Sequence, residues 1–399
     1  MSSTIETEKP DTDQKQVPGA GAHSHGADDV PVQTRSERFA SALHDDFPEV
    51  TGRELEWRLT PVEKVRDLID GELDGGRFPA VVSEAAGVTT EWVGRDDARV
   101  GSAGLAEERA AANAWSSFQE ALAVTLTAEE FTEVVIDRTG ADRAPRAAHT
   151  ILTAGPNARG IIVIDNRGSA RLSENVEIVV GDGAHLTVVS LQEWDDESVH
   201  LSSQFARIGR DAVLKHVVVS LGGSVVRVNP SAHLAEQGAT GELLGLYFSD
   251  AGQHLEQRVY VHHDAPNTVS RVTYKGALNG EGARTVWVGD VLIGRTAPGT
   301  DSYEQNRNLV LSDGTRADSI PNLEIETGDI AGAGHASATG RFDDEQLFYL
   351  RSRGISEQEA RRLVVLGFLL EVVQKIGQPE LESRLLAAIE AELAAVAVV

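Results

Sequence analysis

The chain has 399 residues, with 36 Lys and Arg against 62 Asp and Glu, which gives a formal net charge of −26 at pH 7. This negative charge argues against a nucleic-acid or anionic-membrane surface, because like charges repel. The chain contains no cysteine. Disulfides, a thiol nucleophile and an iron–sulfur cluster held by its own cysteines are therefore excluded. We expect the partners to be proteins or small ions.

Residues 1–34 are rich in Pro, Gly, Ser, Asp and Thr and contain few large apolar residues. Such a segment buries too little surface to offset the entropy lost on ordering, so we expect a disordered acidic tail. Its two histidines, His23 and His25, are expected to be solvated. The N-terminus does not resemble a secretory leader, and no apolar run approaches the roughly 20 residues of a membrane span. These features predict a cytoplasmic protein.

The region 35–130 is predicted to be helical. Apolar residues recur at helical spacing over Glu63–Ile69, and the alanine-rich segment Glu107–Leu122 has the same periodicity. Trp57 and Trp115 are interpreted as core residues rather than as ligand-stacking aromatics, because that is the commoner role at this spacing.

The region 131–330 consists of short β-branched runs separated by turn clusters. Examples of the runs are IIVID at Ile161, LTVVSL at Leu186 and TVWVGDVLI at Thr285. Several clusters recur at roughly 27 to 30 residues, and no crossover helices intervene, which favours a right-handed parallel β-helix. A sandwich or jelly roll also has short strands and glycine turns, so periodicity alone leaves those folds open.

The region 331–399 is predicted to carry a glycine-rich turn followed by helices. The glycines around His335 predict a turn that leaves the imidazole accessible. Ser356 followed by Glu359 matches a capping box, and a last helix is expected over 380–396. One apolar face of the first long helix is expected partly to serve a partner; it includes Val365, Leu369 and Val373.

The chain lacks the motifs of several enzyme classes. It contains no GxxxxGK[ST], no GxSxG elbow and no HExxH. His262 and His263 are adjacent on a predicted strand, so their side chains point to opposite faces, and a structural role is expected for both.

The C-terminal third carries a resemblance to a known family. PNLEIETGDI, the glycine-flanked His335 and FDDEQLFYLRSRGIS resemble the C-terminal signature of the SufB/SufD family of iron–sulfur cluster assembly scaffolds, particularly its SufD branch. The resemblance extends to YEQNRNLVLSDGTRADSIPNLEI and weakly to LEWRLTPVEKVRDL. Family members commonly have a cysteine two residues before this histidine and a lysine before that cysteine. Here Ala333 and Gly332 occupy those places, which excludes a thiol role.

This resemblance implies a mainly β protein with a β-helix core flanked by N-terminal and C-terminal helices, and thereby favours the solenoid over a sandwich. It implies a non-catalytic scaffold subunit that pairs with a SufB-like scaffold through the β-helix and with a SufC-like ATPase through the C-terminal helices. His335 is then a candidate iron or cluster ligand at the SufB interface, and the cluster is shared rather than held alone. The nearby carboxylates Glu324, Glu326 and Asp329 either assist this histidine or form the solvated face of a strand.

Two other functions remain open at this point. One is a polysaccharide-active β-helix enzyme, which needs acid and base side chains that converge from adjacent turns. The other is a purely structural β-helix homodimer.

Overall fold

The computed structural model describes residues 38–140, 142–341 and 344–395. The predicted tail of residues 1–34, with His23 and His25, lies outside the described residues. The described residues belong to one compact unit, Ser36–Val399.

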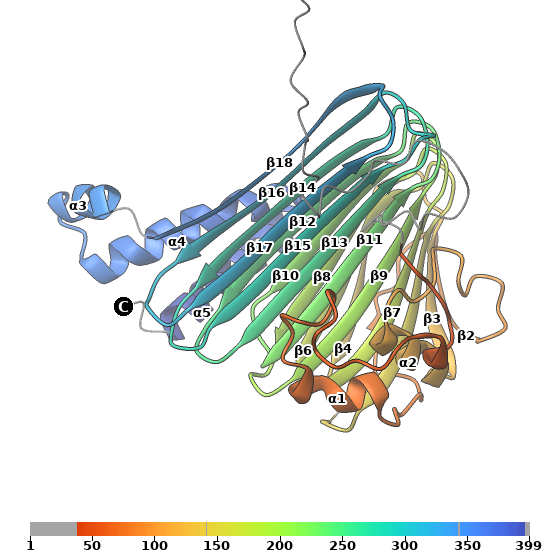
Figure 1. Cartoon of the computed structure of the whole chain (residues 1–399), viewed down its shortest axis with the longest axis horizontal. Coiled ribbons are helices and arrows are strands. Elements are labelled where there is room, and N and C mark those ends of the chain that lie inside the picture. The colour runs from red at the N-terminus through yellow and green to blue at the C-terminus, as the bar shows by residue number, and fades with distance from the viewer. Residues whose placement is uncertain (1–37, 141, 342–343, 396–399) are drawn as a thin grey trace, which may run out of the picture. The chain divides into compact units, whose positions relative to one another are not determined.

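Two nine-stranded sheets form a parallel β-solenoid (Figure 1). From β3 onward, successive strands alternate between the sheets, so that each turn of the chain adds one strand to each. The first sheet contains β1 (Val81–Val82), β4 (Thr132–Thr139), β6 (Arg159–Gly168), β8 (His185–Trp194), β10 (Val213–Ser220), β12 (Thr240–Ser249), β14 (Val269–Leu278), β16 (Thr300–Val310) and β18 (Ile330–Arg341). The second sheet contains β2 (Val88–Gly94), β3 (Glu120–Leu126), β5 (Arg146–Ala154), β7 (Arg171–Val180), β9 (Val199–Ile208), β11 (Val225–Leu234), β13 (His254–His263), β15 (Arg284–Ile293) and β17 (Arg316–Ile325).

The register between turns is parallel and nearly regular. Val188, His216, Leu243 and Val272 occupy equivalent positions and are separated by 28, 27 and 29 residues. Inward-facing side chains of successive turns therefore stack in columns, and most of these columns are apolar. The predicted mainly β solenoid is confirmed.

A stack of left-handed residues fixes one corner of the solenoid. Asparagine or aspartate alternates with glycine at Asn157, Gly183, Asp211, Gly238, Asn267 and Gly299, whose φ angles are 60°, 68°, 51°, 76°, 57° and 73°. Each backbone N–H donates to a carbonyl one turn further along, for example that of Gly183 to Arg210. The side chain of each Asn or Asp stands over the next glycine: a Cβ at Gly238 would lie 2.1 Å from Oδ1 of Asp211. Only glycine fits there.

Two tyrosines and two glycines interlock in the middle of the first sheet. Tyr247 pairs with Gly276, and Gly245 pairs with Tyr274. Each ring covers the neighbouring glycine so closely that a Cβ at Gly276 would lie 1.7 Å from the Tyr247 ring, and one at Gly245 would lie 2.0 Å from the Tyr274 ring. The two glycines make room for the two rings inside the solenoid.

The N-terminal helices cover the second sheet. Helix α1 (Val62–Asp70) lies against α2 (Arg109–Ser117), which packs on β5, β7 and β9. A short 3-10 helix, η1 (His44–Asp46), precedes them. Trp57 and Trp115 are buried, as predicted.

The prediction of a helical N-terminal region over 35–130 is wrong in part, because the region also contains strands. The expected helix Glu107–Leu122 ends at Ser117, and Glu120 begins β3. Strand pairing of β3 with β5 outweighs the helix propensity of its alanines. Strand β18 likewise extends the solenoid beyond the expected limit at residue 330.

The C-terminal helices are α3 (Asp344–Ser352), α4 (Glu357–Val373) and α5 (Pro379–Ala395). Ser356 caps α4 as predicted, because its hydroxyl accepts the N–H of Glu359 at 3.3 Å. Helices α4 and α5 pack on the outer face of the first sheet, whereas α3 lies away from it (Figure 1). Within the described ranges, no helix combines the length and apolarity needed to cross a membrane.

The interlocked glycines give a test of packing. We expect Gly276→Ala to lower the free energy of unfolding by about 1–3 kcal/mol, because the added methyl group must displace the Tyr247 ring. Gly241→Ala is the matched control, since its Cβ would meet its nearest neighbour at an ordinary 3.5 Å. Thermal and urea unfolding of the two variants check this, and equal midpoints would contradict the packing argument.

Candidate functional site

One inward-facing column, apolar except at His216 as far as Val272, ends in two polar residues at the C-terminal end of the solenoid. Strand pairing aligns, in order, Val134, Ile162, Val188, His216, Leu243, Val272, Glu304 and His335. Every member through Glu304 is buried, whereas the His335 side chain is 44% exposed. His335 is exposed because β18 is the last strand of its sheet, and no further turn of the described part of the chain covers it.

The structure places His335 in a strand, so the prediction of a glycine-rich turn is wrong. His335 on β18 pairs with Glu304 on β16. The parallel register between these two strands is regular apart from a shift at Thr300 and Asp301. The glycines beside it are compatible with a strand: a Cβ at Gly334 would meet the Tyr303 ring at an ordinary 3.5 Å. Backbone pairing therefore fixes the direction in which the imidazole points, and it remains accessible as predicted.

Glu304 lies next to this histidine. Its Oε1 is 3.6 Å from Nδ1 of His335, a distance that allows ionic attraction but is too long for a hydrogen bond. Among the described residues neither carboxylate oxygen of Glu304 has a hydrogen-bond partner. Burial, followed by the negative charge of Asp290, raises the pKa of Glu304 to about 8.

The remaining polar groups at this end are largely satisfied by one another. The Tyr247 hydroxyl donates to Asn308 Oδ1 at 2.8 Å and accepts from Asn306, whose own Oδ1 accepts from Ser319 at 2.8 Å. This network lies beside Glu304 on β16 but does not reach it. The end of the solenoid thus combines a satisfied amide network with one unsatisfied carboxylate.

The other sequence-based candidates do not join this site. Val365, Leu369 and Val373 are buried, with at most 1% exposed, and they belong to the apolar cluster between α4 and the first sheet. Direct contact of a partner with these side chains would require α4 to leave the sheet. Their part in binding a partner stays a prediction. The Glu326 carboxylate lies 3.8 Å from the Arg295 guanidinium.

Sequence reasoning missed Glu304. A signal was present, because Ser302, Glu304, Asn306 and Asn308 alternate along one strand where earlier strands place apolar residues. Without the pairing register of β16, however, the same alternation is equally typical of the solvent-facing side of a strand.

A second group of buried charges lies near the other end of the solenoid. The Arg138 guanidinium donates to Glu174 at 2.7 Å, and Glu174 also accepts from His200 at 2.9 Å. These partners hold the pKa of the Glu174 carboxyl well below its usual range, although burial opposes that shift. The group is internally paired, which is typical of a structural network.

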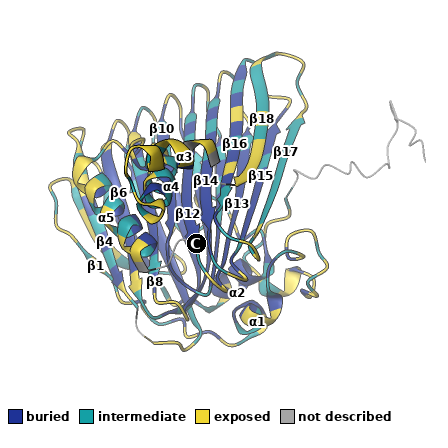
Figure 2. Cartoon of the chain, turned by 90° about the vertical axis from the view of Figure 1, so that its left-hand side faces the viewer, coloured by how far each residue is buried: buried dark blue, intermediate teal, exposed yellow. Residues whose placement is uncertain are grey.

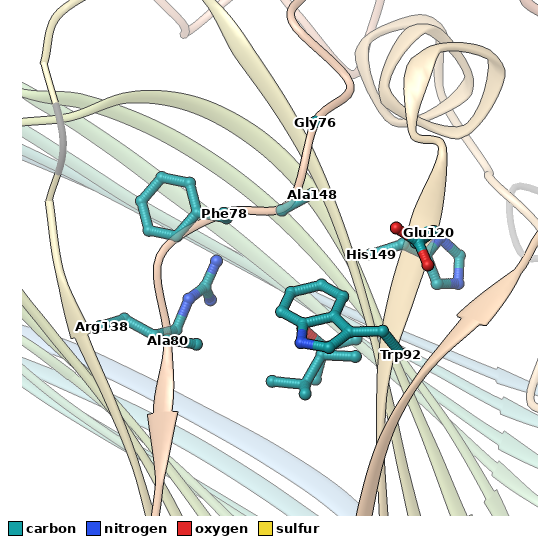
Figure 3. Close-up of a pocket in the computed structure, with 10 residues that line it drawn as sticks. Gly76, Phe78, Ala80, Trp92, Glu120, Arg138, Ala148 and His149 are labelled. Carbon is teal, nitrogen blue, oxygen red and sulfur yellow. The ribbon is translucent and has the colours of Figure 1, made fainter.

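A small pocket adjoins this group. Figure 3 shows Phe78, Arg138 and Trp92 around it, with His149 and Glu120 at its other side. The guanidinium lies 4.7 Å from the centre of the Phe78 ring, and His149 contacts Glu177 at 2.8 Å. The pocket is remote in the strand order from β18, and its charged groups are engaged in packing the N-terminal turns.

The predicted opposite placement of His262 and His263 is confirmed. His263 is buried and contacts Thr268 and Ser270, whereas His262 stacks on His233 at a ring distance of 5.0 Å. Over residues 38–140, 142–341 and 344–395, no three His, Cys, Asp or Glu side chains are grouped to hold a metal ion. The Glu304–His335 pair can therefore supply part of a ligand set and needs further donors.

Comparison with known proteins gives consistent matches. A family model described as the SufBD core domain of SUF system FeS cluster assembly matches residues 137–368. An "iron-sulfur cluster assembly SufBD family protein" of Mycobacterium bovis is 52% identical over 374 residues, which cover 91% of this chain and 94% of that protein. A protein of the same description from Mycobacterium leprae is 51% identical, with coverages of 89% and 93%. One from Staphylococcus saprophyticus is 32% identical over 49% of this chain and 41% of its own length.

His216, in the same column as Glu304, gives a pH test. Burial lowers the pKa of His216 to about 4, so the folded protein binds fewer protons than the unfolded chain between that pH and the ordinary value near 6.5. Its contribution to the free energy of unfolding is thus complete above about pH 6.5 and falls by up to about 3 kcal/mol as the pH is lowered to 4.

We expect His216→Gln to remove this contribution while keeping a donor for Gln204, which His216 contacts at 2.7 Å. Urea unfolding of both proteins from pH 4 to 8 measures it. Parallel stability curves for the two proteins would show that His216 is not held neutral.

Proposed function

Since this chain belongs to the SufBD family of the SUF system for iron–sulfur cluster assembly, we propose that it acts as a scaffold subunit and not as a self-contained enzyme. The observation that carries this proposal is His335, a partly exposed imidazole on the last strand of the solenoid, beside a buried carboxylate. A neutral imidazole is a suitable ligand for iron. Iron and the growing cluster are the cargo of this site.

We propose that a SufB-like scaffold docks at this end. Strands β17 and β18 are the last in their sheets, so each has one edge without a strand partner among the described residues. Such edges are ready to pair with another sheet. Docking there would bring thiolates, which this chain lacks, next to His335, and the cluster would be shared across the interface. A homodimer through the same edges is the alternative, and it would bring two histidines together without any thiolate.

We propose that the ATPase partner, a SufC-like protein that supplies the missing P-loop, binds the C-terminal helices. The buried face of α4 is occupied by the first sheet. On α3, however, the Phe348 and Tyr349 side chains are 75% and 57% exposed. Figure 2 shows α3 as largely exposed, in contrast to the mostly buried strands of the solenoid. Adjacent exposed aromatic residues of this kind commonly anchor protein interfaces.

We propose that the assembly works in the cytoplasm. A polysaccharide-active enzyme is less well supported, because the carboxylate at the candidate site faces a histidine inside the solenoid and not a second carboxylate across an outer groove.

The role of His335 is tested by His335→Ala in the complex reconstituted with the scaffold and ATPase partners. We expect folding and complex formation to persist, because a half-exposed side chain without a hydrogen bond contributes little packing. Cluster formation, followed anaerobically by absorption and Mössbauer spectroscopy, should fall at least about tenfold. Normal cluster formation by this variant would exclude His335 as a ligand.

The α3 surface is tested separately. We expect Phe348→Asp with Tyr349→Asp to abolish capture of the ATPase partner and leave the melting temperature nearly unchanged, because both side chains are exposed. Leu369→Asp is the contrasting variant, and it should unfold the protein because Leu369 is fully buried. Undiminished capture by the double variant would place the ATPase elsewhere.

A further inference from the structure

A buried carboxylate that has no hydrogen-bond partner among the described residues lies next to the end of the inward-facing column. The Glu304 side chain is 1% exposed, and neither of its oxygens accepts a hydrogen bond from the described residues. A carboxylate in this setting is strongly unfavourable unless a cation or donors compensate it. No Lys or Arg side chain of the described residues forms an ion pair with Glu304. The basic group within ion-pair distance of it is the His335 imidazole.

The opposite sheet leaves space for this carboxylate. Gly289 faces it from β15, and a Cβ at that position would lie 2.3 Å from Oε2 of Glu304. Gly289 does not have a positive φ angle, so its backbone does not require glycine. A side chain at Gly289 is excluded because its Cβ would lie too close to the Glu304 carboxylate and only 2.4 Å from the Trp287 ring. Gly289 thus makes room for the Glu304 carboxylate, whose oxygens accept no hydrogen bond from the described residues.

The spacing of the two side chains fits a shared metal ion. With donors about 2.1 Å from a metal, two neighbouring ligands of a tetrahedral ion are about 3.4 Å apart. Oε1 of Glu304 and Nδ1 of His335 are 3.6 Å apart. An ion between them requires only a small side-chain adjustment. A carboxylate that merely oriented the imidazole would instead be expected at hydrogen-bond distance.

We propose that Glu304 and His335 together bind one ferrous ion, as neighbouring carboxylate and imidazole ligands, at the open end of the solenoid. This inference rests on the proposed function, which supplies iron as the cargo. A mixed oxygen and nitrogen ligand pair suits ferrous iron. Because no third protein ligand is grouped with this pair in the described ranges, the remaining coordination positions face the free edge of β18, where water or a docked subunit completes them.

The test is an anaerobic titration of the purified full chain with Fe²⁺, read by equilibrium dialysis and calorimetry. We expect one saturable site per chain, weakened about tenfold or more in both Glu304→Gln and His335→Ala. Asp301→Asn is the matched control: Asp301 lies on the same strand, faces outward and pairs with Arg271. This control should bind Fe²⁺ as the unaltered chain does.

A loss of folding is distinguished from a loss of ligation by melting without metal. Glu304→Gln should melt at the same or a higher temperature than the unaltered chain, because a neutral amide replaces a buried, unpartnered carboxyl group. Glu304→Leu, which extends the apolar column beyond Val272, is a second variant with the same expected loss of binding. Added Fe²⁺ should raise the melting temperature of the unaltered chain and not that of either variant.

Two results would overturn the proposal: no saturable Fe²⁺ binding by the unaltered chain, or binding by Glu304→Gln and Glu304→Leu within twofold of it. Cluster formation in the reconstituted complex separates this inference from the proposed function. If cluster formation depends on His335 but not on Glu304, the proposed scaffold function is supported, and the proposal that the two side chains act as a ligand pair is rejected. If Glu304→Gln and His335→Ala both lose Fe²⁺ binding while clusters form normally, the ion site is supported, but it has no role in cluster assembly.

Discussion

Parallel, in-register hydrogen bonding between successive turns is the constraint on which this molecule depends. It places each side chain directly over its counterpart one turn earlier, so each side chain is in contact with the equivalent side chain of the next turn. Inside the solenoid this favours unbroken apolar columns. A polar residue in a column must find its partner within one or two turns, as Asn306 does with Tyr247. Glu304 is buried in such a column without a partner of this kind.

The same constraint explains why the candidate site lies at an end. The outer face of the first sheet is covered by α4 and α5, and part of the second sheet is covered by α1 and α2. An inward-facing side chain in the middle of the solenoid is enclosed by turns on both sides. At β18 one of those turns is missing, so His335 points along an interior column and still reaches the outside.

The sequence was sufficient for features that depend on neighbouring residues. Strand-forming runs, the turn spacing and the Ser356 cap follow from local pattern and were predicted correctly. Features that depend on distant pairing were not accessible. The segment after Ser117 has helical composition but becomes β3 because β5 is beside it. The apolar face of α4 is equally consistent with a partner or with the sheet, and the sheet occupies it.

Half of the candidate site was proposed from the sequence. His335 was identified through a family resemblance and its accessibility, but its strand geometry depends on β16, which lies 31 residues earlier in the register. Glu304 could be recognised only once that register paired it with His335.

The alternating stack of Asn or Asp with Gly at one corner has a consequence for how this architecture changes over evolutionary time. Each corner backbone N–H donates to a carbonyl of the next turn, and each Asn or Asp side chain also covers the following glycine. Inserting or deleting one residue within a strand would turn the later side chains of that strand to the other face. Gain or loss of two whole turns keeps the alternation and preserves every contact except at the joint. Length differences within the strands of related solenoids should therefore come in whole turns, which lets the solenoid lengthen or shorten while the chemistry at its open end stays the same.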